Sequence, residues 1–237
     1  MTEKQDKTEK NNKKNIVVPG EIISHGDEFL PGDWTMKDGN NIISTRLGIV
    51  EKFDKLIKII PITGVYIPRR GNTVIGEVKD ITMNGWMVDI KGPYSSFLPL
   101  RECAGFVEES EMENVYGIGD LIETKILDVK RTSIDLTMKQ RDRGLGKIRE
   151  GIIVDVNPHR VPRLIGKEGS MISIIKEATK CNITVGQNGI VWIRGDNVHD
   201  QVFAKKAVEF VIENTITDWL TEKVEDFLKK NKTGVKE

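Results

Sequence analysis

Short apolar runs separated by turn residues dominate the first quarter of the chain. Isoleucine, leucine and valine gather at 42–43, 47–50 and 56–60, and Pro31-Gly32-Asp33 is one of several turn signals between such runs. Runs of this length, bounded by glycine, proline and aspartate, are typical of strands joined by tight turns. We therefore predict a small all-β unit over residues 15–68.

Five further apolar segments follow in residues 69–141. They lie at 74–78, 86–90, 96–100, 121–127 and 134–138. Asn84-Gly85 separates the first two segments and is a strong hairpin signal. Five strands at this spacing predict a small OB-type barrel.

The last third of the chain mixes strand and helix patterns. A strand is predicted at 151–156, and the residues after Ser170 place their apolar side chains on one helix face. Gly186-Gln187-Asn188-Gly189 lies between two apolar runs and predicts a hairpin. Amphipathic helices are predicted over 198–214 and 217–230, so this part is α+β.

A Gly-Lys-Glu-Gly loop stands before the first of these helices. Gly166 and Gly169 let the backbone come close to a ligand, and the helix that starts at Ser170 offers unpaired N–H groups and the positive end of its dipole. A phosphodiester backbone suits that arrangement.

The order strand, helix, GxxG, helix, hairpin and helix resembles a type I KH module, which clamps about four nucleotides of single-stranded RNA. The candidate RNA-binding residues here are Arg160, Arg163, Ile165, Gly166, Lys167, Glu168, Gly169 and Ser170. For Ile165, Ile172 and Ile175 we consider both the wall of a base groove and core packing. Trp192 either stacks on a base or belongs to the core between sheet and helices.

The barrel segment resembles the S1 group of OB folds. The runs that match include Asn84-Gly85-Trp86-Met87-Val88-Asp89-Ile90 and Phe97-Leu98-Pro99-Leu100-Arg101-Glu102. The resemblance implies single-stranded RNA binding on the barrel face. In our alignment Asn84 and Met87 occupy aromatic positions of that group, Pro99 its His position and Lys130 its Asp position.

The candidate phosphate contacts on the barrel are therefore Lys79, Arg101, Lys130 and Arg131. An ordinary solvated face is the alternative for these four side chains. Trp86 is a candidate either for stacking or for the barrel core.

Composition excludes several classes of protein. The chain has 237 residues, with 36 basic and 36 acidic side chains and a formal net charge of zero, which argues against a general polyanion binder. Residues 1–14 are predicted to be a disordered tail, and residues 142–150 a linker. No apolar run has the length of a membrane span and no secretory signal is present, so a cytoplasmic protein is expected.

The chemistry-bearing residues predict no enzyme. Cys103 and Cys181 lie far apart, so neither a structural zinc site nor a disulfide is indicated, and we expect no metal and no cofactor. There is no Gly-x-Ser-x-Gly elbow and no Walker loop. The glutamates between 108 and 113 form one acidic run, which is expected to be a solvated loop.

A β unit, an S1 barrel and a KH module in this order resemble the RNA-binding cap subunits of the archaeal exosome, which are ribosomal-RNA-processing proteins. Supporting runs lie at 17–21, 85–90 and 164–171. The bacterial phosphorolytic ribonuclease has KH before S1, and the other exosome cap subunit has a zinc ribbon in place of KH.

The resemblance implies a non-catalytic subunit, present in three copies on a hexameric ring of phosphorolytic 3′–5′ exonuclease subunits. Residues 15–68 would dock to the ring, residues 69–141 and 151–215 would hold single-stranded RNA, and residues 216–237 would add a C-terminal helix and tail. The alternative is a standalone RNA-binding regulator or translation-associated factor.

Overall fold

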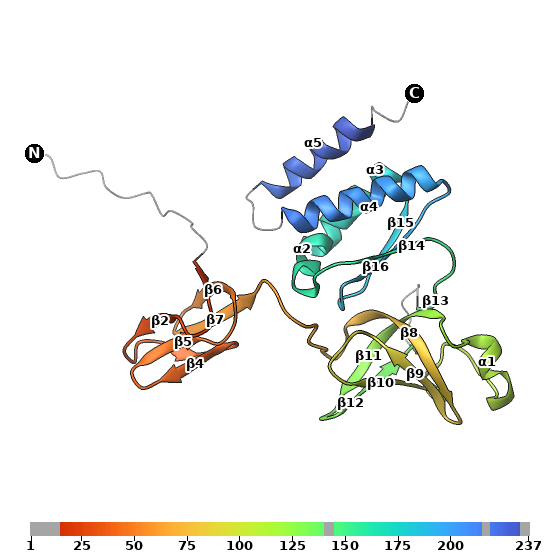
Figure 1. Cartoon of the computed structure of the whole chain (residues 1–237), viewed down its shortest axis with the longest axis horizontal. Helices are drawn as coiled ribbons and strands as arrows, with labels where there is room; N and C mark the ends of the chain where they lie inside the picture. The colour runs from red at the N-terminus through yellow and green to blue at the C-terminus, as the bar shows by residue number, and fades with distance from the viewer. Residues whose placement is uncertain (1–14, 140–144, 215–218, 233–237) are drawn as a thin grey trace, which may run out of the picture. The chain divides into compact units, whose positions relative to one another are not determined.

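The computed structural model describes residues 15–139, 145–214 and 219–232 (Figure 1). The chain divides into two compact units, Met1–Thr63 and Gly64–Glu237. The predicted tail at 1–14, and parts of the predicted linker and C-terminal segment, lie outside the described residues.

The N-terminal unit is all-β, as the short apolar runs predict, and it consists of two small sheets. One sheet has the order β1-β6-β7-β3 and the other β2-β5-β4. Ile42 of one sheet and Ile57 and Ile59 of the other are buried. The strands are β1 (Ile16–Val17), β2 (Ile22–His25), β3 (Leu30–Pro31), β4 (Thr35–Asp38), β5 (Asn41–Ser44), β6 (Gly48–Phe53) and β7 (Leu56–Pro61).

Five strands of the second unit close into a barrel, which confirms the OB-type prediction. β12 pairs in parallel with β10 and antiparallel with β11, so the sheet β10-β9-β8-β11 returns on itself. Trp86 is fully buried in this barrel and donates from Nε1 to the Tyr116 carbonyl at 3.0 Å, so it belongs to the core. The barrel strands are β8 (Thr73–Thr82), β9 (Gly85–Asp89), β10 (Ser95–Pro99), β11 (Leu121–Val129) and β12 (Ser133–Thr137).

Shorter elements join the barrel strands to one another and to the next module. The 3-10 helix η1 (Leu100–Glu102) follows β10, and η2 (Glu109–Glu111) runs into α1 (Met112–Val115) before β11. The short strand β13 (Gly146–Lys147) pairs with β11.

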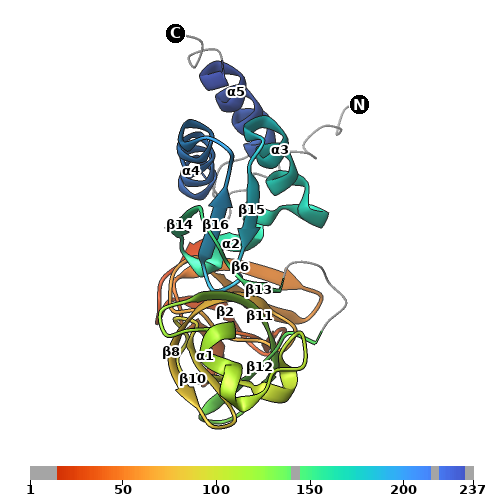
Figure 2. The same ribbon diagram turned by 90° about the vertical axis from the view of Figure 1, so that its right-hand side faces the viewer.

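The KH module has a three-stranded sheet of order β14-β16-β15, with helices packed on one face (Figure 2). Val191 and Ile193 face the helices and are fully buried there. Because side chains alternate along a strand, Trp192 lies on the opposite face, so the interpretation that it packs between sheet and helices is wrong. The elements are β14 (Ile152–Asp155), η3 (Pro158–Arg160), α2 (Val161–Ile165), η4 (Lys167–Gly169), α3 (Ser170–Thr179), β15 (Asn182–Val185), β16 (Ile190–Arg194), α4 (Val198–Glu213) and α5 (Leu220–Lys232).

The C-terminal helix α5 extends the KH core. Phe227 stacks on Phe210 of α4 with ring centroids 4.4 Å apart, and Val224 and Leu228 are buried in the same cluster. Trp219, predicted to lie on this helix, precedes it and is exposed.

The hairpin between β15 and β16 joins the KH module to the barrel through Asn188. The buried Asn188 amide donates from Nδ2 to the carbonyls of Ile75 and Ile90 at 2.7 and 2.9 Å, and its Oδ1 accepts from the Ile75 N–H at 3.3 Å. The Gln187 N–H also donates to the Thr73 carbonyl at 2.8 Å. One side chain thus satisfies three backbone groups of the barrel.

Candidate nucleic-acid interface

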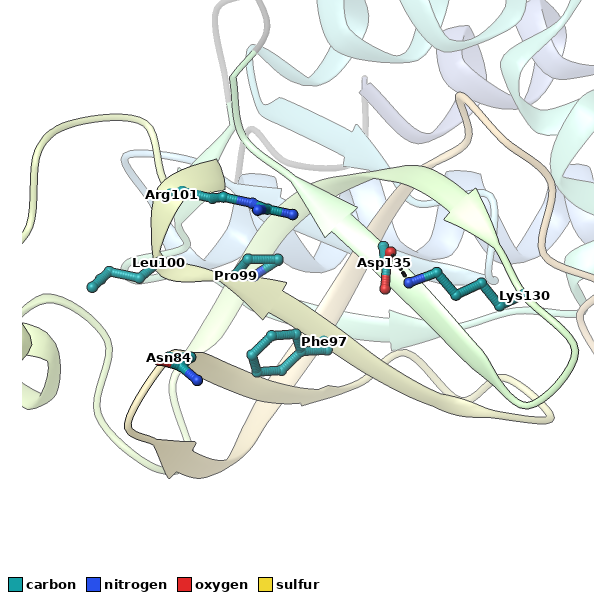
Figure 3. Close-up of a pocket in the computed structure, with 7 residues that line it drawn as sticks. All are labelled: Asn84, Phe97, Pro99, Leu100, Arg101, Lys130 and Asp135. Carbon is teal, nitrogen blue, oxygen red and sulfur yellow. Dashed lines mark ion pairs between the residues drawn. The ribbon is translucent and has the colours of Figure 1, made fainter.

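A pocket of about 480 Å³ opens on the outer surface of the barrel (Figure 3). It is lined by Asn84, Phe97, Pro99, Leu100, Arg101, Lys130 and Asp135. The volume falls in the range of small-ligand sites and is enough for a nucleotide.

Strand alternation places the aromatic ring in this pocket. On β10, Ser96 and Leu98 point into the barrel and are buried, so Phe97 points outward and is half-buried. Phe97 pairs in register with Met87 of β9 and with Asp135 of β12. A flat apolar ring therefore lies between an apolar side chain of β9 and a carboxylate of β12, an arrangement that can stack one base.

Charges of both signs surround the ring. Arg101 comes from η1 and is exposed, while Lys130 directly follows β11. Lys130 Nζ is 2.6 Å from Asp135 Oδ2. Of the predicted barrel cations, the structure brings Arg101 and Lys130 together in the pocket.

The other two predicted barrel cations do not line this pocket. Lys79 on β8 forms an ion pair with Glu77 at 2.7 Å, and Arg131 is exposed in the turn between β11 and β12. Sequence reasoning assigned no role to Phe97 or Asp135. The signal that could have found Phe97 is the alternation in residues 95–99, which buries Leu98 and therefore exposes its neighbour.

The GxxG loop of the KH module has an unusual run of backbone conformations. Gly166, Glu168 and Gly169 all have positive φ, at 76°, 53° and 82°. A Cβ at Gly166 would lie 2.7 Å from the Met171 amide nitrogen, whereas a Cβ at Gly169 would meet nothing within 4 Å. Gly166 is therefore required by local packing, and Gly169 borders open space.

The start of α3 faces this open space. α3 begins at Ser170 as predicted, and among the described residues no side chain caps it. Its first-turn amides and the positive helix terminus suit an anion, and Lys167 is exposed beside them. Glu168 is also exposed and reduces the local positive charge.

The remaining candidates of the KH module divide into surface and interior positions. Arg163 is exposed, whereas Arg160 donates from Nη1 to the Ile212 carbonyl near the end of α4 at 2.8 Å. Ile172 and Ile175 are buried in the core, and Ile165 is half-buried at the end of α2. Of these three isoleucines, Ile165 remains at the surface beside the loop.

An OB-type barrel with an aromatic, cation-lined pocket, followed by a KH module with an open GxxG loop, defines the class of multidomain RNA-binding proteins. Family models match two parts of the chain. Residues 14–63 match the exosome RNA binding protein RRP4 N-terminal domain, and residues 151–199 match a KH domain.

Known proteins match over most of the chain. It is 42% identical to the exosome complex component Rrp4 of Methanothermobacter thermautotrophicus, over 94% of this chain and 70% of the relative. It is 39% identical to the component of the same name from Nitrosopumilus maritimus, over 92% and 97%. A solved structure described as an exosome complex RNA-binding protein is similar with a TM-score of 0.63 and 29% identity, over 73% of this chain and all of that one. The chain belongs to the Rrp4 family of exosome components.

In the part of the chain that the structure describes, no helix is long and apolar enough to cross a membrane. The same residues contain no group of three or more His, Cys, Asp or Glu side chains placed to hold a metal ion.

Proposed function

We propose that this chain is the non-catalytic RNA-binding cap of an exosome, which captures single-stranded RNA and guides its 3′ end into a phosphorolytic exonuclease ring. The observation that carries the proposal is the open GxxG loop at the start of α3, in a chain 42% identical to an exosome component. The barrel pocket supplies a second grip.

The two grips are of different chemistry. At the GxxG loop the proposed contacts are main-chain amides, with Lys167, Arg163, Ser170 and Ile165 around them and Arg160 held on the KH body. At the barrel they are base stacking on Phe97 and phosphate contacts from Arg101 and Lys130, with Lys79 and Arg131 as outlying cations. Two weak sites on one chain raise the effective concentration of RNA while each contact stays easy to break.

The N-terminal unit supports the assembly part of the proposal. It leaves many large apolar side chains exposed, and three of them, Leu30, Leu56 and Phe53, are in register across β3, β7 and β6. A group of neighbouring exposed apolar side chains is typical of a protein interface. We infer that this surface docks on the ring subunits, with three copies per ring. These side chains, with exposures of 39–69%, are Ile16, Val18, Ile22, Leu30, Met36, Phe53, Leu56 and Ile60.

Gly169→Asp tests the RNA-binding part. The new side chain enters open space and places a negative charge where a phosphate would bind, so the affinity for single-stranded RNA should fall by about tenfold or more. Gly119→Asp is the matched control, because Gly119 also has a positive φ and open space but lies on the barrel. Equal affinities for the wild type and Gly169→Asp would refute the role of the loop.

Phe53→Asp tests the assembly part separately. Phe53 is 69% exposed on β6, so the substitution should leave the fold and the RNA affinity of the isolated chain unchanged. Association with exonuclease ring subunits, measured by size-exclusion chromatography, should be lost. If the wild-type chain does not associate with the ring subunits, the alternative of a standalone RNA-binding regulator is favoured.

A further inference from the structure

The barrel pocket contains an ion pair that conflicts with RNA binding. Lys130 and Asp135 are 2.6 Å apart, and their side chains are 55% and 23% exposed. Figure 3 shows the Lys130 side chain directed at Asp135, beside the ring of Phe97. Asp135 therefore neutralises Lys130, one of the two cations that line the pocket. Its negative charge also repels an RNA phosphate.

The backbones of both residues are fixed, so only side chains need to move to separate them. The Lys130 N–H donates to the Ser133 carbonyl at 2.8 Å and closes the turn after β11. Asp135 is held in β12 between β10 and β11. Lysine is a flexible point charge with three donors, and the Lys130 side chain is more than half exposed, so the pair contributes little net stability.

We propose that Asp135 and RNA phosphate compete for Lys130, so that RNA enters the barrel pocket by displacing an internal carboxylate. The proposal rests on the pocket's role in RNA binding. Its consequence is a grip that is weaker than the two cations alone would give and that is released when Lys130 returns to Asp135. Such a grip suits RNA that must move along the surface towards a nuclease.

A second ion pair in the same barrel differs from the one in the pocket. Lys147 on β13 pairs with Asp120, and these side chains are 33% and 24% exposed. Asp120 Oδ2 also accepts from the Gly117 N–H, so that carboxylate is tied into the loop. Neither residue lines the pocket. The more exposed Lys130 is the one placed to exchange partners.

Asp135→Asn tests the competition on the full chain. Asparagine keeps the shape and removes the charge, so the affinity for a single-stranded RNA of about 12 nucleotides should rise by about threefold to tenfold. The released cation should also steepen the dependence of log K on log salt by about 0.7. Glu51→Gln is the control, because it breaks an ion pair of the same kind, to Lys58 at 2.7 Å, in the N-terminal unit.

The double variant with Lys130→Gln separates competition from simple repulsion. If Asp135 and RNA compete for Lys130, then Asp135→Asn should raise the RNA affinity much less when Lys130 is replaced. The dependence of log K on log salt should then stay unchanged. An equal gain in both backgrounds would overturn the proposal, since it would show that Asp135 acts on RNA without Lys130.

Phe97→Ala distinguishes failure of this proposal from failure of the pocket itself. If Phe97→Ala leaves the RNA affinity unchanged, the pocket does not bind RNA. The proposed RNA site on the barrel and the proposed competition for Lys130 are then both wrong. If Phe97→Ala weakens binding but Asp135→Asn does not tighten it, the pocket binds RNA and the competition alone is wrong.

Discussion

The GxxG loop and the barrel pocket are two candidate grips on one RNA, and they are built in different ways. The loop relies on backbone: three positive φ angles and an uncapped helix start leave amides open to an anion. The pocket relies on side chains that come from separate strands, a turn and η1. A backbone site tolerates changes in its side chains, whereas a pocket of side chains does not.

The two sites resemble each other in their charge, because each pairs a cation with a nearby carboxylate. Lys167 and Glu168 are adjacent and exposed at the loop, and the chain as a whole is neutral. At the pocket, Lys130 is held by Asp135. Both sites therefore carry a negative charge beside their cations. We infer that this charge lowers the affinity of each site for RNA.

The link between the two sites gives the largest predicted effect. Asn188→Ala removes an amide that satisfies three barrel groups and leaves them buried without partners, so the chain should lose about 2–4 kcal/mol of unfolding free energy. Thermal unfolding would measure this. Gln187→Ala keeps the backbone bond to Thr73 and should cost far less. Similar losses for both variants would contradict the role of Asn188.

The two glycines of the loop should differ in their effect on stability. Gly166 combines φ 76° with ψ 175°, a region almost restricted to glycine, and a Cβ there meets Met171. Gly166→Ala should therefore destabilise the protein by about 2–3 kcal/mol, whereas Gly169→Ala should cost about 1 kcal/mol. Chemical denaturation of both variants tests this, and equal costs would remove the distinction between a packing glycine and a surface glycine.

Two substitutions test whether RNA binding depends on side chains at the pocket and on backbone at the loop. Phe97→Ala removes a stacking ring and should cost about 1–3 kcal/mol of binding. Lys167→Gln leaves the loop amides in place and should cost less than about 1 kcal/mol. Fluorescence anisotropy with the same RNA would measure the affinity of both variants. A larger loss of affinity for Lys167→Gln would show that the loop binds RNA through its side chain more than through its amides.

A smaller predicted effect on stability concerns pH and lies where the barrel meets α3. Burial raises the pKa of Glu123 on β11 to about 7, while Lys176 of α3 acts in the opposite direction. The folded protein thus holds this proton more tightly than the unfolded chain. The stabilisation is complete below the ordinary pKa of the carboxyl and is lost as pH rises towards 7.

Glu123→Gln should remove this dependence. Between about pH 5 and about pH 8 the wild type should lose about 1 kcal/mol, or about 2–4 °C in Tm, relative to the variant. If Tm changes with pH in the same way in both proteins, the pKa of Glu123 is not raised by folding.

Much of the fold follows from local sequence. The five apolar segments of residues 69–141 give the barrel strands, because alternation and the Asn84 turn leave little choice of register. The GxxG loop is visible because glycine and a helix start must be neighbours in the chain. Trp86 and Trp192 show the limit: both lie on strands, and only the packing of the sheets decides which of them is enclosed.

The barrel pocket was predicted only in part for the same reason. Arg101 and Lys130 were found as cations, but Phe97 and Asp135 come together through the pairing of β10 with β12, which are far apart in the chain. The Asn188 contact is also invisible locally. A turn of glycines and asparagine predicts a hairpin, and nothing nearby in sequence shows that its side chain ends against the backbone of β8.

We expect one RNA strand to contact both the barrel pocket and the GxxG loop. Crosslinking of short single-stranded RNA to the complex assembled with exonuclease ring subunits, followed by mapping of the crosslinked peptides, tests it most directly. Our account predicts crosslinks in the peptide that contains Phe97 and Arg101 and in the peptide that contains Gly166 and Lys167. Crosslinks confined to other parts of the chain, with neither peptide modified, would contradict it.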